Sequence, residues 1–155
     1  HEAGHVFHQR NPLYTDNLKE NSSVYYPFNR LSWKFHEQKT GKNLSKFDDI
    51  VPERVHLRYY TVNEKDLIKN KKIQKHLEGW QQTSFLTLYS MAYPSEDWAE
   101  SFMMYFIKKY HKGEYEVQYN GKIFKPCLNK SLCEKKHRLM SLYLNNPDLF
   151  SISEG

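Results

Sequence analysis

Two histidines four residues apart, in a segment that can form a helix, restrict this chain more than any other feature of its sequence. The first five residues are His1-Glu2-Ala3-Gly4-His5. On an α-helix, side chains four positions apart lie on one face, so both imidazoles can hold one metal ion. Glu2 lies about 100° round the helix, where it can reach a water on that metal and act as a general base. Gly4 is unfavourable inside a helix and indicates close packing behind the site.

A zinc site of this kind needs a third ligand, because a catalytic zinc ion normally has three protein ligands and one open position. In one large class, the third ligand is a histidine ten residues after the first and follows a glycine at the eighth position. Here these positions hold Asn11 and His8, which excludes that class. His8 lies on the same stripe, but about 10 Å along the helix from His1, so a polar or capping role is expected for it. The alternative is that the motif arose by chance on a surface helix.

A second group of candidate ligands lies at the start of a strongly apolar segment. Pro94-Ser95-Glu96-Asp97 favours the start of a helix, with its acids near the positive end of the helix dipole. The residues that follow are apolar nearly all round the helix, which indicates burial; they are Trp98, Phe102, Met103, Tyr105, Phe106 and Ile107.

Glu96 and Glu100 are again four apart and enter this buried helix. An uncompensated buried carboxylate is costly, so each needs a partner. We expect Glu96 to be the third zinc ligand and Glu100 to accept the N–H of a ligating imidazole. The alternative is that both acids face solvent at the helix start.

The two segments together, H-E-x-G-H followed by Y-x(6)-E-x-x-A-E-x-F, resemble the gluzincin metallopeptidases, most closely the family of the anthrax lethal factor catalytic domain. The resemblance implies one Zn²⁺ ion, a hydrolytic reaction and the following roles. His1, His5 and Glu96 would bind zinc, Glu2 would be the base, Glu100 would support a ligand, and Tyr89 would stabilise the transition state. Apart from the resemblance, Tyr93 is a second candidate for the role of Tyr89, and the alternative is that both tyrosines are packing residues. The resemblance covers two short blocks. The ninety residues between His5 and Glu96 exceed the family's expected spacing, so an inserted segment must loop out or pack on the site.

The expected fold is α+β and predominantly helical, the C-terminal portion of a zincin-like metallopeptidase domain with a small β-hairpin. Residues 1–155 fit a single catalytic domain or subdomain, which we expect to be truncated on its N-terminal side. The expected function is that of a zinc-dependent endopeptidase acting on a protein or peptide. The alternative is a catalytically silent metal-binding or protein-interaction module derived from a metallopeptidase. A copper site at an N-terminal histidine is disfavoured. The enzymes that use such a site resemble all-β sandwiches, whereas this chain is expected to be mainly helical.

The net charge of +5 would permit contact with nucleic acid or anionic membranes. Its densest basic stretch, however, is interpreted as a solvated surface helix that begins at Asn63 and ends at Gly79. We therefore expect no nucleic-acid partner. No segment has the run of uncharged apolar residues that a membrane span requires.

Cys127 and Cys133 have five residues between them, and a disulfide across that loop is geometrically allowed. Alternatively, Cys133 is a thiol in the first turn of a helix that a capping box at Ser131 begins and that runs to about residue 144. A small metal site formed with His137 is disfavoured. Asn-x-Ser sequons at positions 21, 43 and 129, with the disulfide, favour a secreted or extracytoplasmic setting.

Four further elements are expected from local patterns. The motif helix should cover about residues 1–9 and end near Asn11-Pro12. Residues 28–38 can form a short helix, and residues 55–62 have strand propensity. Residues 115–124 should form a hairpin around Asn120-Gly121.

Overall fold

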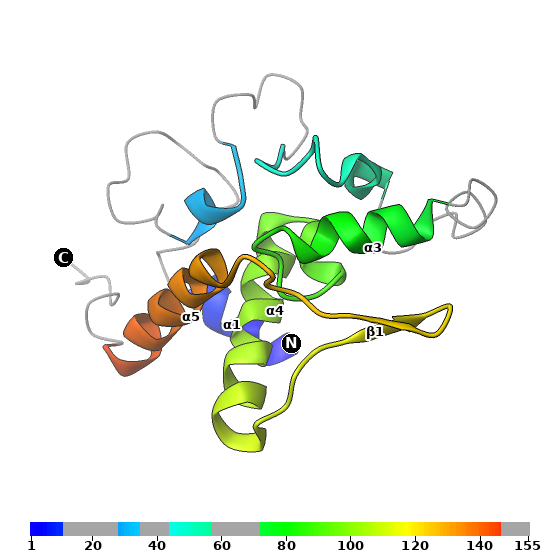
Figure 1. Cartoon of the computed structure of the whole chain (residues 1–155). Coiled ribbons are helices and arrows are strands. Elements are labelled where there is room, and N and C mark those ends of the chain that lie inside the picture. Colours follow the sequence, from blue (N-terminus) through cyan, green and yellow to red (C-terminus); the bar gives the residue numbers. More distant parts are fainter. Residues whose placement is uncertain (11–27, 35–43, 57–71, 147–155) are drawn as a thin grey trace.

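A buried helix at the centre of the protein organises the chain. The computed structural model describes residues 1–10, 28–34, 44–56 and 72–146, with the backbone alone at 7–10 and 55–56. Within these ranges the protein is α+β and mostly helical, with a two-stranded antiparallel sheet. Helix α4 (Pro94–Phe106) packs against α1 (Glu2–Arg10) and α5 (Lys130–Asn145) (Figure 1). None of the described helices combines the length and apolar character needed to cross a membrane.

The local sequence accounts for both ends of α4. Tyr93 is extended and precedes Pro94, whose ring suits the first helical position because no intrahelical N–H bond is needed there. A short 3-10 helix, η4 (Tyr89–Met91), packs against this end. At the other end the chain widens into a π-helix, η5 (Ile107–His111), which stops at Lys112 in the left-handed conformation.

Gly4 sets the contact between α1 and α4. A Cβ atom at this position would lie 2.9 Å from Ala99 Cα and 3.1 Å from Ala99 O. The two backbones therefore meet at a place where only a glycine fits on the α1 side. This explains the helix-disfavouring residue inside the motif, and it agrees with the close packing expected there.

Two clusters of buried side chains form the core. One joins α4 and α5 through Trp98, Tyr105, Met140 and Tyr143, with Phe28 in front of 3-10 helix η1 (Asn29–Leu31). The other lies around α3 (Ile73–Gln81) and the second hairpin strand; its members are Trp33, Phe47, Val51, Leu77, Trp80, Phe85, Met91 and Phe124. The first cluster buries the apolar face that α4 turns toward α5, as the apolar sequence of α4 indicates.

The hairpin prediction is confirmed. Strands β1 (Val117–Tyr119) and β2 (Lys122–Phe124) are antiparallel, with Tyr119 opposite Lys122. Asn120 and Gly121 both have positive φ values, of 48° and 71°, as a two-residue type I′ turn requires.

The Cys127–Cys133 disulfide is present, with a Cα–Cα distance of 5.8 Å. It excludes both a free thiol at Cys133 and a metal site with His137. The predicted capping box at Ser131 is wrong, because α5 already begins at Lys130, after Asn129. The disulfide and the hydrogen bond from Leu128 N–H to Gln81 C=O fix the approach to the helix.

The helix expected at residues 28–38 is wrong in its extent, because the helical turn stops at Leu31. Hydrogen bonds from Lys34 N to Leu44 O and from Lys46 N to Ser32 O hold the following residues extended instead. Phe35 to Gln38 lie outside the described residues.

The strand expected at residues 55–62 is wrong at its start. Val55 and His56 belong to the 3-10 helix η3 (Pro52–His56), which begins at a proline and contains the buried Arg54. The Arg54 side chain contacts Asp48 Oδ1 at 2.7 Å and donates to the carbonyl of Met91, and both contacts hold this turn in place. The remainder of that stretch lies outside the described residues.

The charged helix expected from Asn63 to Gly79 does not end at the glycine. Helix α3 runs to Gln81, and Asn63 lies outside the described residues. A Cβ on Gly79 would lie 2.5 Å from Ile50 O, so this glycine serves backbone packing and not helix termination.

Candidate metal centre

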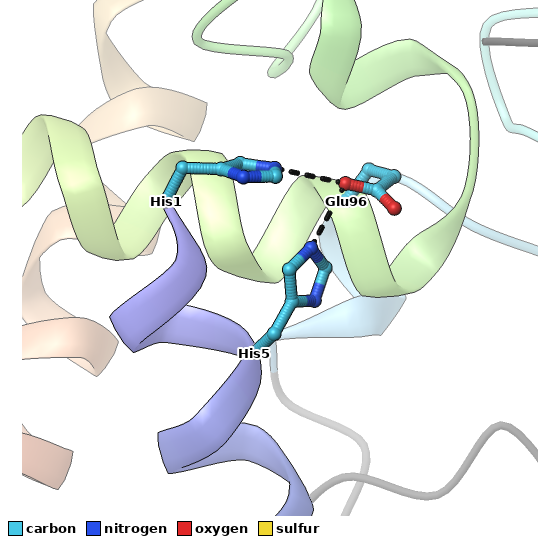
Figure 2. Close-up of side chains that lie close together, drawn as sticks. All are labelled: His1, His5 and Glu96. Carbon is cyan, nitrogen blue, oxygen red and sulfur yellow. Dashed lines mark hydrogen bonds and ion pairs between the residues drawn. The ribbon is translucent and has the colours of Figure 1, made fainter. Parts of the chain in front are cut away.

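Side chains from the two sequence motifs meet on one side of α4. The Nε2 atom of His1 lies 3.0 Å from Oε2 of Glu96, and the Nε2 atom of His5 lies 3.1 Å from the same oxygen. Figure 2 shows the imidazoles of His1, directly before α1, and of His5, within α1, pointing at Glu96 in the first turn of α4. Residues more than ninety positions apart in the chain therefore form a single cluster.

The donor atoms of this cluster suit a divalent transition metal. Two imidazole nitrogens and one carboxylate oxygen are the ligand set of one class of catalytic zinc sites. Ligands at 2.0–2.2 Å from a tetrahedral ion would be separated by about 3.3 Å, close to the two nitrogen–oxygen distances. One ligand atom from each residue lies within 4.8 Å of the others. The three side chains are 15% to 22% exposed, so solvent and a substrate can reach them.

The charges around His1 favour a cation. Burial acts to lower the pKa of His1, but hydrogen bonds with Glu2 and Glu96, and the charge of Glu100, outweigh it, so the pKa is raised. Glu100 Oε1 lies 3.6 Å from His1 Nε2. Acidic groups therefore surround the nitrogen that faces the cluster.

Glu100 is held from the opposite side by a hydroxyl group. Thr87 Oγ1 donates to Glu100 Oε2 at 2.6 Å, and both residues are buried. Burial raises the pKa of Glu100 against the effect of this hydrogen bond. Glu100 was expected to accept the N–H of a ligating imidazole, from the ring nitrogen that does not face the metal. Its contact is instead with Nε2 of His1, the nitrogen that faces Glu96. Nothing in the sequence singled out Thr87.

Glu2 lies at the solvent side of the cluster. Its Oε1 atom is 3.0 Å from His1 Nδ1, and 89% of its side chain is exposed. Glu2 thus contacts Nδ1 of His1, the ring nitrogen that faces away from Glu96, and this is the contact that the sequence assigned to Glu100. At this exposure little of the Glu2 side chain is packed against other residues.

Tyr89 and Tyr93 stand at the start of η4 and directly before α4. The Tyr89 ring, at the start of η4, is 5.5 Å from the His1 ring between centroids. Tyr93 is 38% exposed and is the residue before α4. Tyr89 is therefore the tyrosine that contacts a residue of the cluster. The His8 side chain lies outside the described residues.

A buried ion pair fixes the turn that carries Glu96. Lys136 Nζ on α5 lies 2.5 Å from Asp97 Oδ1, and both side chains are fully buried. Trp33 Nε1 donates to the other oxygen of Asp97 at 3.1 Å. Burial raises the pKa of Asp97 and lowers that of Lys136, and their mutual attraction opposes both shifts. The sequence pointed to Asp97 only as an acid at a helix start, because its partners lie far away in the chain.

Comparisons with known proteins give no match. No family model matches the chain, and no curated protein or solved structure matches it either. The relationship to gluzincins therefore stays a proposal that depends on the two motifs and on the geometry described above.

Proposed function

We propose that this protein is a zinc-dependent endopeptidase that hydrolyses peptide bonds in a protein or peptide substrate. The observation that carries the proposal is the convergence of His1 Nε2, His5 Nε2 and Glu96 Oε2 at 3.0 and 3.1 Å. The helical H-E-x-x-H segment supplies two of these atoms and an acid beside them, which is the arrangement that zinc peptidases use.

In this mechanism His1, His5 and Glu96 would hold the zinc ion through the three atoms that converge. When bound, zinc polarises the scissile carbonyl and lowers the pKa of a water molecule toward 7. Glu2 turns from His1 Nδ1 toward the cluster, takes the proton of the attacking water and delivers it to the leaving amine. Its high exposure allows this rotation.

Two neighbouring residues support the reacting groups. The hydroxyl of Tyr89, whose ring contacts His1, donates to the carbonyl oxygen as negative charge develops there. Glu100, held by Thr87, adds negative charge beside His1 Nε2 and so favours a cation at the cluster.

The alternative is a metal-binding module without turnover. One observation favours it: Glu2 contacts the outer nitrogen of His1, as a carboxylate that only orients a ligand would. In that case Glu2 stays in place and no base faces the open side of the cluster.

Zinc content tests the site. Purified protein should bind one zinc ion, as measured by inductively coupled plasma analysis after dialysis, and Glu96→Gln should lose most of it. Asp49→Asn, which removes the same charge from an exposed position, is the matched control and should bind zinc normally. If the unchanged protein binds no zinc, the three side chains form a hydrogen-bonded cluster and the proposal fails.

Cleavage of a peptide library separates the two functions. Zinc-loaded protein should cleave at least one peptide, and zinc-loaded Glu2→Gln should lose about 10²-fold or more of the rate. A zinc-loaded Glu2→Gln that cleaves at the full rate would refute the assignment of the base. Zinc binding with no cleavage of any peptide would support the silent module.

A further inference from the structure

A cavity of about 640 Å³ lies on another side of α4 from the metal cluster. Ser101, Tyr105 and Lys108 line it from α4 and η5, and Cys133 and His137 line it from α5. Ser101 and Tyr105 lie about 100° or more round α4 from Glu96 and Glu100, and none of His1, His5, Glu96 and Glu100 lines the cavity. The cavity is therefore separate from the proposed zinc site, and its size is that of a small-molecule pocket.

The charges that line the cavity are unbalanced. It is lined by five lysines and two glutamates: Lys108, Lys112, Lys125, Lys130, Lys136, Glu114 and Glu134. Asp97 neutralises Lys136, and Glu114 pairs with Lys125 at 2.8 Å. This leaves three lysines, which form no salt bridge within the described part of the chain, against Glu134.

Neighbouring groups respond to this positive charge. Burial and the charge of Lys108 lower the pKa of His137. The pKa of Glu114 is lowered by its hydrogen bond with Lys125 and by the charges of Lys125 and Lys108. The fields of separate lysines thus overlap in the cavity, which favours an anion there.

A buried hydroxyl group in the cavity wall lacks a partner. Ser101 is 2% exposed, and its Oγ atom forms no hydrogen bond within the described residues. Buried polar groups are nearly always hydrogen-bonded, so this hydroxyl has an unused donor for a group that enters the cavity beside it. Tyr105, Tyr115 and Met104 add aromatic and apolar wall around it.

We propose that this cavity binds a phosphorylated small molecule with an aromatic body, of the nucleotide class. A phosphate group carries more than one negative charge and several acceptor oxygens, so it balances the excess charge of Lys108, Lys112 and Lys130 better than a carboxylate, which carries one charge. The aromatic body would lie against the tyrosines, and the Ser101 hydroxyl would donate to a ligand oxygen. This site does not depend on the proposed peptidase function.

Calorimetric titration tests the proposal. The full chain is titrated with ATP, AMP, adenosine and pyrophosphate in metal-free buffer, so that the zinc cluster cannot take part. ATP and AMP should bind, while adenosine should bind at least about tenfold more weakly, because it lacks the charged group. Pyrophosphate should bind less tightly than ATP. Equal binding of pyrophosphate and ATP would refute the aromatic part, and no binding of any phosphate compound would refute the whole.

Matched variants locate the site. Lys108→Ala/Lys112→Ala should weaken ATP binding about tenfold or more, because two charge-assisted contacts are lost. Lys46→Ala/Lys75→Ala removes the same charge from exposed positions that do not line the cavity and should change affinity less than about twofold. Equal losses in both variants would mean that ATP binds a diffuse basic surface, and the proposal would fail.

Ser101→Ala gives a signature that a purely structural role does not. Because the hydroxyl is unpaired in the folded protein, its removal should leave thermal stability unchanged or raise it, while ATP affinity falls. Lower stability with unchanged affinity would contradict the role of Ser101 in binding.

Discussion

The buried pair between Asp97 and Lys136 allows a quantitative test of how the turn that carries Glu96 is held. Both side chains have no solvent exposure, and Lys136 Nζ is 2.5 Å from Asp97 Oδ1. Lys136→Met keeps most of the side-chain volume but removes the charge, and leaves Asp97 buried without its cation. Breaking such a pair from one side costs about 3–5 kcal/mol of unfolding free energy, a large part of the total for a domain.

Removing the carboxylate charge as well should recover part of this loss. In Lys136→Met/Asp97→Asn no charge remains buried, and the amide oxygen can still accept the hydrogen bond from Trp33 Nε1. We expect the double variant to be more stable than Lys136→Met by about 2 kcal/mol, because the uncompensated charge is gone. The zinc affinity of Lys136→Met should also fall, since Asp97 directly follows Glu96 in the first turn of α4 and its pair with Lys136 holds that turn.

Urea unfolding followed by circular dichroism compares the unchanged protein, Lys136→Met, Asp97→Asn and the double variant. Lys135→Met, at an exposed position on the same helix, is the control. The control should lose less than about 0.5 kcal/mol. A loss below about 1 kcal/mol in Lys136→Met, or a double variant whose loss equals the sum of the single losses, would refute the description of this pair as buried and coupled.

Other substitutions test the helix contact, a buried histidine and the disulfide. Gly4→Ala gains about 1 kcal/mol of helix propensity but forces a Cβ to within 2.9 Å of Ala99 Cα, and overpacking costs about 1–3 kcal/mol. A lower melting temperature and weaker zinc binding are expected, and normal values for both would contradict the close approach. Burial lowers the pKa of His76, and the charge of Glu53 opposes this with a smaller effect. As the pH falls below about 6.5, His76 therefore takes up a proton in the unfolded chain but not in the folded protein, and the folded protein loses stability. Urea unfolding should show that the unfolding free energy falls less between about pH 7 and 5 in His76→Gln than in the unchanged protein. An equal fall in both proteins would reject His76 as the cause. Cys127→Ser/Cys133→Ser should lose about 2 kcal/mol for so short a loop, measured against the oxidised protein, and reducing agent should have no further effect on the variant.

Local patterns predicted the elements whose causes lie within a few residues. The start of α4 follows from Pro94 and the apolar run after it, and the hairpin follows from Asn120-Gly121. The meeting of His1 and His5 with Glu96 was expected from the spacing within each motif and the need for a third ligand. These features depend on residue types that permit few other arrangements.

Partners that are distant in the chain could not be predicted in the same way. Asp97 meets Lys136, 39 residues later, and Thr87 meets Glu100 across the turn before α4. An acid at a helix start has the same sequence signature whether it faces solvent or a buried lysine. Gly79 is a similar case, because a glycine that admits a neighbouring backbone and one that ends a helix look alike in the sequence.

The meeting of main chains at Gly4 and Ala99 has a consequence for how this protein can vary. Because backbone touches backbone there, the gap between the imidazoles and the acid facing them is set by peptide geometry and not by the choice of rotamers around it. Residues at the outward-facing positions of both helices can be substituted without altering that gap. An inserted or deleted residue between the two histidines, by contrast, would rotate one ring away by about 100° and separate the trio in a single step.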